Sequence, residues 1–183
     1  MTVLKRESDI YPANLLETIA PWDQWWVIYT LSRHEKQLMR KLRASAVRHY
    51  GPQFIKRTQS PRGRIRSTQQ PLFPNYVFLT GDEHARLLAL QTNCVSRIVP
   101  VVDVEQLVTD LRQLRDLIAT GAPITPEEKL VPGDRVRVRS GPFKDFEGTV
   151  IQREGQRRLI IAVNFTSQGA SVRLDECQLE NIG

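Results

Sequence analysis

A proline-rich joint separates two different patterns of residues in this chain. It lies at residues 122–132 and holds three prolines in eleven positions. Proline lacks an amide hydrogen and fixes φ, so such a stretch disfavours helix and sheet and suits a semi-extended linker. The 183 residues are enough for two small domains. We therefore expect a flexible N-terminal arm at 1–22, a first domain at 23–121, the linker at 122–132 and a second domain at 133–183.

The part before the joint alternates strand and helix patterns. Aromatic and β-branched residues at 25–31 predict a strand. Ser32 and Glu35 have the spacing of a capping box that opens a helix, and Gly51 followed by proline predicts its end. Further along we expect a short strand at 53–57, a polar loop at 58–68 with Pro61 and Gly63 at its tip, and a strand at 73–80. After these we expect a helix following Asp82, a strand at 95–102 and a helix from Asp103 to near Gly121. This order predicts an α+β fold, a helix-backed sandwich built on a mainly antiparallel sheet.

The part after the joint has the pattern of a small five-stranded β-barrel. Turn signals every eight to twelve residues separate expected strands at 134–139, 149–153, 158–163, 170–174 and 179–182. We expect Gly141 to adopt a positive φ and Gly148 to allow a close backbone approach or a bulge. Phe143 and Phe146 are the large side chains available to fill a core otherwise made of Val, Ile and Leu.

Charge is distributed unevenly along the chain. The net charge is +6, and all of it lies before the joint, because residues 122–183 hold 9 basic and 9 acidic groups. Residues 33–66 alone hold 11 basic groups against one acidic residue, Glu35. Such a one-sided field attracts polyanions, of which nucleic acid is the commonest. The alternative interpretation of this run is a solvated helix face and a polar loop.

Several classes of protein are disfavoured by what the sequence lacks. There is no GxSxG, P-loop, HExxH or GxGxxG pattern, so we expect no enzyme activity and no cofactor. Cys94 and Cys177 are isolated, and no histidine has a partner at metal-ligand spacing, so we expect neither a disulfide nor a metal site. No apolar run has the length of a membrane span or a signal peptide, so we expect a cytoplasmic protein that binds no membrane. We also expect a monomer.

The segment Pro-Leu-Phe-Pro-Asn-Tyr-Val-Phe-Leu at 71–79 is apolar on both faces of the expected strand. Tyr76 and Phe78 share one face by the two-residue period, and Val77 and Leu79 share the other. A strand of this kind is either central in a sandwich or partly exposed for a partner. The aromatic residues alone leave both interpretations open.

Two segments resemble the NusG family of transcription elongation factors. Residues 71–79 are similar to the core strand of its NGN domain. Residues 136–150, with the pattern Gly-Pro-Phe-x-x-Phe-x-Gly, resemble its KOW motif, which has an SH3-like barrel. The resemblance implies that Tyr29, Phe73, Tyr76 and Phe78 line a depression that receives the clamp helices of RNA polymerase. It also implies that a basic hairpin lies near DNA of the elongation complex, with contacts from Lys56, Arg57, Arg62, Arg64 and Arg66.

Pro-Leu-Phe-Pro-Asn-Tyr is closer to the specialised RfaH-like antitermination paralogues than to the housekeeping pattern Phe-Phe-Pro-Gly-Tyr. The resemblance therefore implies a regulator that suppresses pausing or termination. In housekeeping members a turn of the KOW domain docks a ribosomal protein or Rho. The matching turn here is 164–169, and its aromatic residue is displaced by one position. Because a shift of one position turns a side chain to the other face, a ribosome or Rho partner is in question. Glycines and β-branched residues predict that the second domain stays a barrel and does not refold into helices.

A KOW-containing ribosome-associated or RNA-binding protein is the alternative function. Such a protein would need basic residues on the barrel. The neutral charge of residues 122–183 disfavours it.

Overall fold

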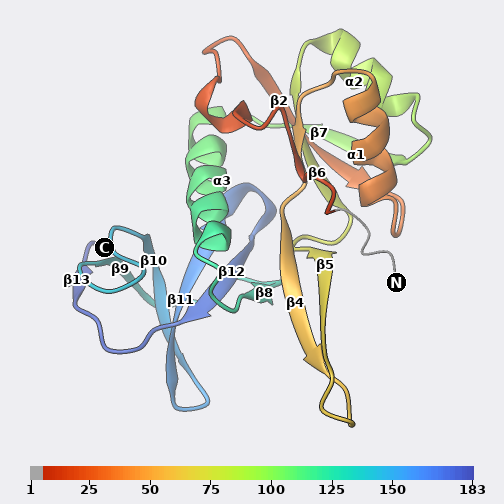
Figure 1. The fold of residues 1–183 in the computed structure, drawn as a ribbon. Helices are drawn as coiled ribbons and strands as arrows, with labels where there is room; N and C mark the ends of the chain where they lie inside the picture. The colour runs from red at the N-terminus through yellow and green to blue at the C-terminus, as the bar shows by residue number, and fades with distance from the viewer. Residues whose placement is uncertain (1–5) are drawn as a thin grey trace. The chain divides into compact units, whose positions relative to one another are not determined.

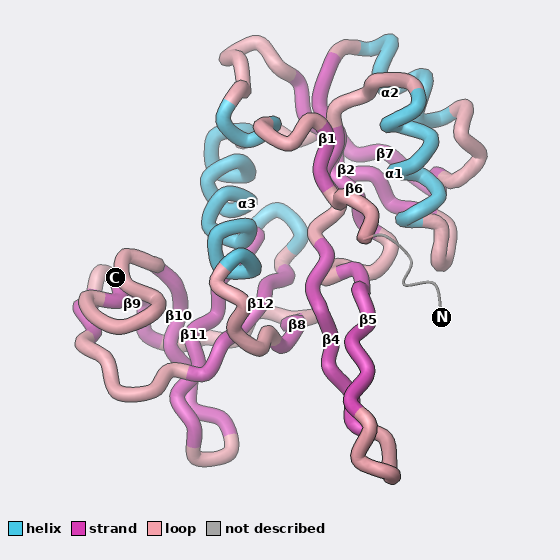
Figure 2. Tube along the Cα trace, in the orientation of Figure 1, coloured by secondary structure: helices cyan, strands magenta, loops and turns pink. Residues whose placement is uncertain are grey.

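The computed structural model describes residues 6–183, which divide into an N-terminal unit ending at Val104 and a C-terminal unit running from Glu105 to Gly183. Figures 1 and 2 show the helices and strands of each unit. The fold is mixed α and β with antiparallel sheets, as the sequence predicts. No helix within residues 6–183 is long and apolar enough to cross a membrane.

The N-terminal unit is built on a five-stranded antiparallel sheet. Its strand order is β1-β3-β6-β2-β7. The predicted strands at 25–31, 73–80 and 95–102 are present with small changes of boundary. The strands are β1 (Ile10–Tyr11), β2 (Gln24–Thr30), β3 (His49–Tyr50), β6 (Tyr76–Gly81) and β7 (Val95–Pro100).

Two helices cover one face of this sheet. They are α1 (Glu35–Ala44) and α2 (Glu83–Leu90). Trp26 and Ile28 of β2 join Val77 and Leu79 of β6 in one buried cluster with α1 residues such as Leu38. The intervening residues of both strands lie on the opposite face, because side chains alternate along a strand. The segment that is apolar on both faces is thus a central strand, since β6 lies between β3 and β2.

The starts of the two helices differ in how well the sequence predicts them. Asp82 caps α2, with a carboxylate oxygen that accepts from the Ala85 amide at 2.9 Å. The capping box expected at Ser32 and Glu35 is wrong, because His34 is the N-cap residue of α1 and makes no side-chain cap hydrogen bond. The Glu35 carboxylate instead accepts from the backbone amide of Asn75 at 2.6 Å.

The part of the expected arm at residues 6–22 packs against the sheet. β1 pairs with β3, and Leu15 and Leu16 are fully buried. The Asp9 carboxylate accepts from the Gln53 amide at 2.9 Å. These contacts differ from the loosely docked arm expected from the sequence, since a two-residue strand and one short 3-10 turn carry no periodic signal. Residues 1–5 of that arm lie outside the described residues.

A long two-stranded hairpin extends from the N-terminal unit (Figures 1 and 2). It consists of β4 (Gln53–Gln59) and β5 (Ile65–Pro71), which pair only with each other. The polar loop expected at 58–68 is therefore wrong, and only the turn between the two strands is irregular. Beyond Phe54 both faces of the hairpin are exposed, so there is no apolar alternation to mark the strands.

The C-terminal unit holds one helix and a six-stranded antiparallel sheet of order β13-β9-β10-β11-β12-β8. All five predicted strands are present, and β8 is an additional edge strand inside the expected linker. Proline is tolerated there because an edge strand leaves one side of its backbone unpaired. The elements are α3 (Val104–Ala119), β8 (Thr125–Glu127), β9 (Asp134–Val138), β10 (Glu147–Arg153), β11 (Gln156–Val163), β12 (Gln168–Arg173) and β13 (Leu179–Asn181).

The turn between β9 and β10 has the expected glycine geometry. Gly141 has a φ of 86°, and the rings of Phe143 and Phe146 meet edge to face with centroids 6.3 Å apart. A Cβ atom on Gly148 would lie 2.3 Å from the carbonyl oxygen of Ile160, so only glycine allows β10 to approach β11 this closely. The geometry of this region thus depends on Gly141 for its positive φ and on Gly148 for its close approach to β11.

Helix α3 is hydrogen bonded to the C-terminal strands. Gln113 exchanges two hydrogen bonds of 2.8 Å with the backbone of Glu147. Asp110 accepts from the backbone amide and the side-chain amide of Asn164, at 3.0 and 3.1 Å. By these contacts α3 belongs with the strands that follow it, although the predicted first domain extends to residue 121.

Candidate binding sites

Two tyrosines and an arginine lie side by side across three strands of the N-terminal sheet. Tyr29 on β2 is the cross-strand partner of Tyr76 on β6 and of Arg97 on β7. The two tyrosine rings have centroids 4.7 Å apart, and the Arg97 guanidinium lies 4.2 Å from the Tyr29 centroid. Both rings are half-buried and Arg97 is exposed. We call these three residues the tyrosine patch.

The four aromatic residues expected to line one depression fall into two layers. Tyr29 and Tyr76 are at the surface, whereas Phe73 and Phe78 are 2% and 0% exposed. The two phenylalanine rings meet edge to face at 6.4 Å. In this structure Phe73 and Phe78 therefore support the sheet, and only the tyrosines present a ring to a partner. Arg97 was missed because its place beside Tyr29 depends on strand register.

The turn before β6 fixes the position of Tyr76. Asn75 has a φ of 68°, a left-handed conformation that asparagine tolerates better than most residues. Its amide donates to the buried Glu35 carboxylate, and its carbonyl accepts from Thr30 at 2.9 Å. Burial raises the pKa of the Tyr76 hydroxyl, with a smaller contribution in the same direction from Tyr29. The hydrogen bonds of Asn75 thus fix the position of Tyr76 at the start of β6.

The five basic residues predicted to contact nucleic acid all lie on the hairpin formed by β4 and β5, which we call the basic hairpin. Every one of their side chains is exposed. In the part of the chain that the structure describes, none of the five forms an ion pair or donates a side-chain hydrogen bond. The residues are Lys56, Arg57, Arg62, Arg64 and Arg66.

The other basic residues of the 33–66 run are mostly engaged within the fold. Arg40 pairs with Glu7, and Arg48 pairs with Asp23. Side chains of three more donate to backbone carbonyls, namely Lys36 to Gln69, Lys41 to Thr92 and Arg43 to Ser8. Ten of the eleven basic residues thus separate into five with partners in the fold and five exposed on the hairpin. The eleventh, Arg33, is exposed and belongs to neither group.

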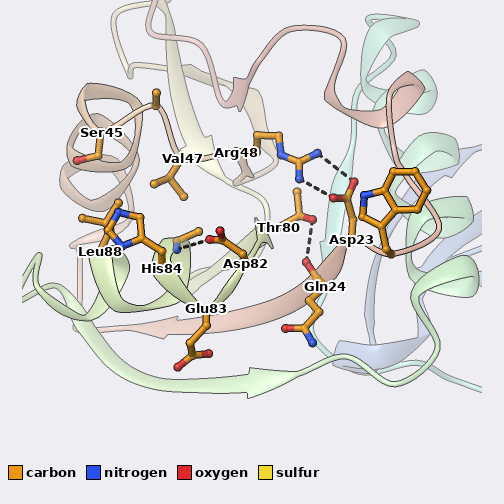
Figure 3. A pocket seen from close by; sticks show the side chains of 14 residues that line it. Asp23, Gln24, Ser45, Val47, Arg48, Thr80, Asp82, Glu83, His84 and Leu88 are labelled. Carbon is orange, nitrogen blue, oxygen red and sulfur yellow. Dashed lines mark hydrogen bonds and ion pairs between the residues drawn. The ribbon is translucent and has the colours of Figure 1, made fainter.

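An open pocket of about 740 Å³ is lined by residues at the ends of α1, β2, β6 and α2. Figure 3 shows the side chains that line it. Its charged groups already have partners. Two hydrogen bonds of 2.6 and 3.0 Å join Arg48 to Asp23, and those bonds hold the pKa of the Asp23 carboxyl below its usual value against the effect of burial. Asp82 caps α2. Trp22 at the pocket edge is 82% exposed. The ion pair and the helix cap stabilise the fold.

The turn that the sequence matches to a ribosome or Rho contact lies at the end of β11. Phe165 in this turn is 38% exposed, and the preceding Asn164 is bound to Asp110 of α3. Ser167 has a φ of 52°, which ends the short 3-10 turn. Part of the turn is therefore already used within the C-terminal unit, and Phe165 is the side chain left available.

Comparison with known proteins matches two successive segments of the chain. Residues 23–116 match the family described as transcription termination factor nusG, and residues 132–162 match the KOW motif. The chain is 26% identical over 178 residues to the transcription termination/antitermination protein NusG of Pseudomonas aeruginosa, covering 87% of this chain and 98% of that protein. The protein of the same name from Escherichia coli K12 is 25% identical over 182 residues, covering 88% and 97%. That of Vibrio cholerae is 26% identical over 182 residues, covering 89% and 98%.

These matches define a chain with an N-terminal NusG domain followed by a KOW motif. The chain belongs to the NusG family. The resemblance seen in the sequence is thereby confirmed at the level of the family, whose description is that of a transcription factor and not of an enzyme.

Proposed function

We propose that this protein regulates transcription elongation by binding RNA polymerase through its N-terminal domain and suppressing pausing and termination, as a specialised antitermination paralogue. The tyrosine patch is the observation that carries this proposal. It presents two aromatic rings and a cation on one face of a rigid sheet. Aromatic and arginine side chains dominate the binding energy of protein interfaces, so the patch is suited to anchor a partner helix.

The basic hairpin supplies the second contact of the proposed complex. Its free cations fit the phosphates of the DNA that emerges from an elongation complex. Phosphate contacts position a protein on nucleic acid without selecting a sequence. In this proposal the tyrosine patch anchors the factor on the polymerase clamp helices, and the hairpin orients it toward DNA.

The proposed mechanism is conformational. A factor that binds the active arrangement of the polymerase clamp more tightly than the paused arrangement shifts the population toward elongation. No bond is made or broken, and no cofactor takes part. The effect on pausing is then limited by the difference in affinity between the two arrangements.

Two local features support the specialised subtype. Asn75 takes the left-handed position where the housekeeping pattern has glycine, so the turn before β6 keeps its conformation with a different residue. The turn after β11 has Phe165 displaced by one position and is bound by Asp110. We therefore expect a ribosome or Rho contact through the C-terminal unit to be weak.

The test is binding of the full-length protein to a reconstituted RNA polymerase elongation complex. Tyr76→Ala should weaken binding by roughly 30-fold or more, the loss typical of a hot-spot aromatic residue. Trp22→Ala is the matched control, because Trp22 is an 82% exposed aromatic residue of the same unit outside the tyrosine patch. Phe78 is unsuitable, since truncating a fully buried phenylalanine costs about 3–5 kcal/mol of folding stability.

The same assay separates the proposal from its alternative. A KOW-containing ribosome-associated or RNA-binding protein would ignore polymerase and bind free RNA or ribosomes in a salt-sensitive way. The C-terminal arginines argue against that function, since Arg137, Arg153 and Arg173 are each paired with a carboxylate. Equal binding of wild type and Tyr76→Ala to the elongation complex would reject the tyrosine patch as the docking surface.

A further inference from the structure

The two faces of the basic hairpin carry different chemistry. Cross-strand partners in an antiparallel pair point to the same face. One face is formed by the pairs Ile55–Gln69, Arg57–Ser67 and Gln59–Ile65, and we call it the isoleucine face. The opposite face is formed by the pairs Lys56–Thr68 and Thr58–Arg66, and we call it the threonine face.

The isoleucine face exposes apolar side chains that the fold leaves uncovered. Ile55 is 47% exposed and Ile65 is 67% exposed. Arg57 lies between them on the same face with a free guanidinium. A large exposed side chain is no anomaly by itself, but two isoleucines that flank an unpaired arginine on a projecting ribbon form a combined apolar and cationic surface.

We propose that the basic hairpin inserts as a β-ribbon into the major groove of duplex DNA, with the isoleucine face toward the base edges. This inference rests on the proposed function, because it specifies the ligand of the hairpin that would lie near DNA. The face carries one group of each kind that distinguishes base pairs in that groove. Arginine recognises guanine O6 and N7, glutamine recognises adenine N6 and N7, and an apolar side chain contacts the thymine methyl group.

Base contacts are confined to the outer part of the ribbon. Gln69 is half-buried, and its amide donates to the backbone of Glu7 at 3.4 Å, so it belongs to the base of the hairpin. Gln59 makes only a long contact of 3.5 Å to the Gly63 carbonyl, which a base would replace. Arg57, Gln59 and Ile65 are therefore the residues that would contact bases.

The threonine face and the turn supply contacts to phosphate. Lys56 and Arg66 point away from the isoleucine face. Their long side chains can curl toward the phosphates at either wall of the groove, as lysine and arginine do when the stem lies along a surface. Arg62 and Arg64 lie in the turn between the strands and are exposed. The cations thus divide into one base-facing residue and four phosphate-facing residues.

The shape and composition of the hairpin favour duplex DNA over other polyanions. A two-stranded ribbon fits the major groove of B-form DNA, whereas the major groove of A-form RNA is too narrow and deep for side chains to enter. Single-stranded nucleic acid is bound on aromatic side chains, and residues 55–70 contain none. The same residues contain no aspartate or glutamate, so nothing repels the phosphate walls.

The experiment begins with selection by the full-length protein from 24-base-pair DNA duplexes whose central ten positions are random. We expect enrichment of a short motif. Fluorescence anisotropy then measures affinity for the selected duplex, a scrambled duplex, the selected single strand and an RNA duplex of the same sequence. The selected DNA duplex should bind at least tenfold more tightly than each of the others. Absence of any enriched motif, or equal affinity for DNA and RNA duplexes, would overturn the inference.

Arg57→Ala and Lys56→Ala are the decisive pair of variants. The residues are adjacent, exposed and equally charged, and they differ in the face on which they lie. Arg57→Ala should reduce the preference for the selected over the scrambled duplex by about 5- to 150-fold, as expected for loss of a bidentate base contact. Lys56→Ala should weaken both duplexes equally and lower the salt dependence of log K by about 0.9, the value for one phosphate. The same loss of preference in both variants would reject the assignment of faces.

These outcomes are separable from failure of the proposed function. Thermal unfolding of each variant checks that the fold is intact. If the free duplex shows no sequence preference while elongation complexes still bind in a Tyr76-dependent way, the groove assignment fails and the proposed function stands. If duplex recognition is found without binding to polymerase, the proposed function fails and the groove assignment stands.

Discussion

The basic hairpin and the C-terminal strands are both antiparallel ribbons rich in arginine, but they use that residue in opposite ways. In the C-terminal unit several arginines pair with carboxylates, as in the contacts of Arg137 with Glu147 and of Arg153 with Glu127. In the hairpin no such pair exists within residues 6–183. The difference teaches that the number of basic residues does not locate a polyanion-binding surface. What indicates such a surface is whether the basic residues have acidic partners around them.

The two ribbons also differ in whether their strands pack against a hydrophobic core. The C-terminal strands bury Leu159, Ile161 and Val172, so their polar side chains are arranged around a core. The hairpin beyond Phe54 buries no apolar side chain. Its sequence is thus free of packing constraints, and substitutions there should alter binding without altering the fold.

Neutralising the basic hairpin is the strongest test of this contrast. Replacement of its five basic residues by glutamine should weaken binding to a 24-base-pair DNA duplex at 100 mM salt by about 10³-fold, because phosphate contacts supply nearly all non-specific affinity. The unfolding midpoint in urea should be unchanged, since these side chains have no partners among residues 6–183. Anisotropy and urea unfolding measure the two quantities on the same preparation.

The matched control is neutralisation of C-terminal arginines. Arg137→Gln with Arg153→Gln removes cations that already have carboxylate partners. DNA affinity should change little, whereas the urea midpoint should fall. If the C-terminal variant lost as much DNA affinity as the hairpin variant, the contrast between the two ribbons would be wrong.

Acidification should affect the sheet from which the hairpin extends, through His49. This side chain is fully buried, and burial lowers its pKa to about 4, against the opposing effect of its hydrogen bond with the Val47 carbonyl. Below pH 6.5 the unfolded chain binds a proton that the folded chain excludes until about pH 4. The contribution of His49 is therefore fully present above pH 6.5 and is lost as pH falls toward 4, by about 3 kcal/mol in total.

Urea unfolding at a series of pH values measures this dependence. His49→Gln removes the titrating group and should flatten the stability curve between pH 6.5 and 4. His84→Gln is the control, because His84 is exposed on α2 and should leave the curve unchanged. A curve equally steep in the His49 variant would assign the acid sensitivity to other groups.

The ion pair between the buried Glu127 of β8 and the partly exposed Arg153 is the third test. The Glu127 carboxylate accepts from Arg153 at 2.9 and 3.1 Å and from the fully buried Ser171 hydroxyl at 2.6 Å. Glu127→Ala leaves that hydroxyl without its acceptor and should cost about 2 kcal/mol of stability, measured by urea unfolding. Asp175→Ala removes an 83% exposed partner of Arg173 and should have no measurable effect.

The same pair predicts a second dependence on pH. Burial by itself would raise the pKa of the Glu127 carboxyl, but the hydrogen bonds from Arg153 and Ser171 outweigh it and lower the pKa. The stabilisation is therefore present above the ordinary value of 4.5 and is lost as pH falls through the lower value of the folded state. Glu127→Gln should reduce the acid sensitivity of the C-terminal unit and leave the duplex affinity of the hairpin unchanged.

The sequence predicted the elements whose side chains alternate between a core and solvent. Strands β2, β6 and β7 and helices α2 and α3 are present near the expected residues, whereas α1 ends at Ala44 and not at the expected Gly51. It missed β1 and β3, of two residues each, and β8, of three residues. It also missed the full length of the hairpin strands, which have no buried face beyond Phe54. Local periodicity exists only where packing imposes it, so short edge strands and fully exposed ribbons leave no pattern to detect.

The candidate sites show the same division. The sequence by itself determined the composition of the proposed binding surfaces and of the C-terminal region. These are the aromatic residues near β6, the five basic residues before it and a C-terminal region of neutral net charge. Tertiary structure alone decided that Phe73 and Phe78 are buried while Tyr29 and Tyr76 reach the surface beside Arg97. It also decided which cations are free. The exposure of the aromatic residues depends on strand register, and the pairing of the cations depends on contacts between residues distant in the chain, such as Arg48 with Asp23. No local pattern of residues encodes either the register or these contacts.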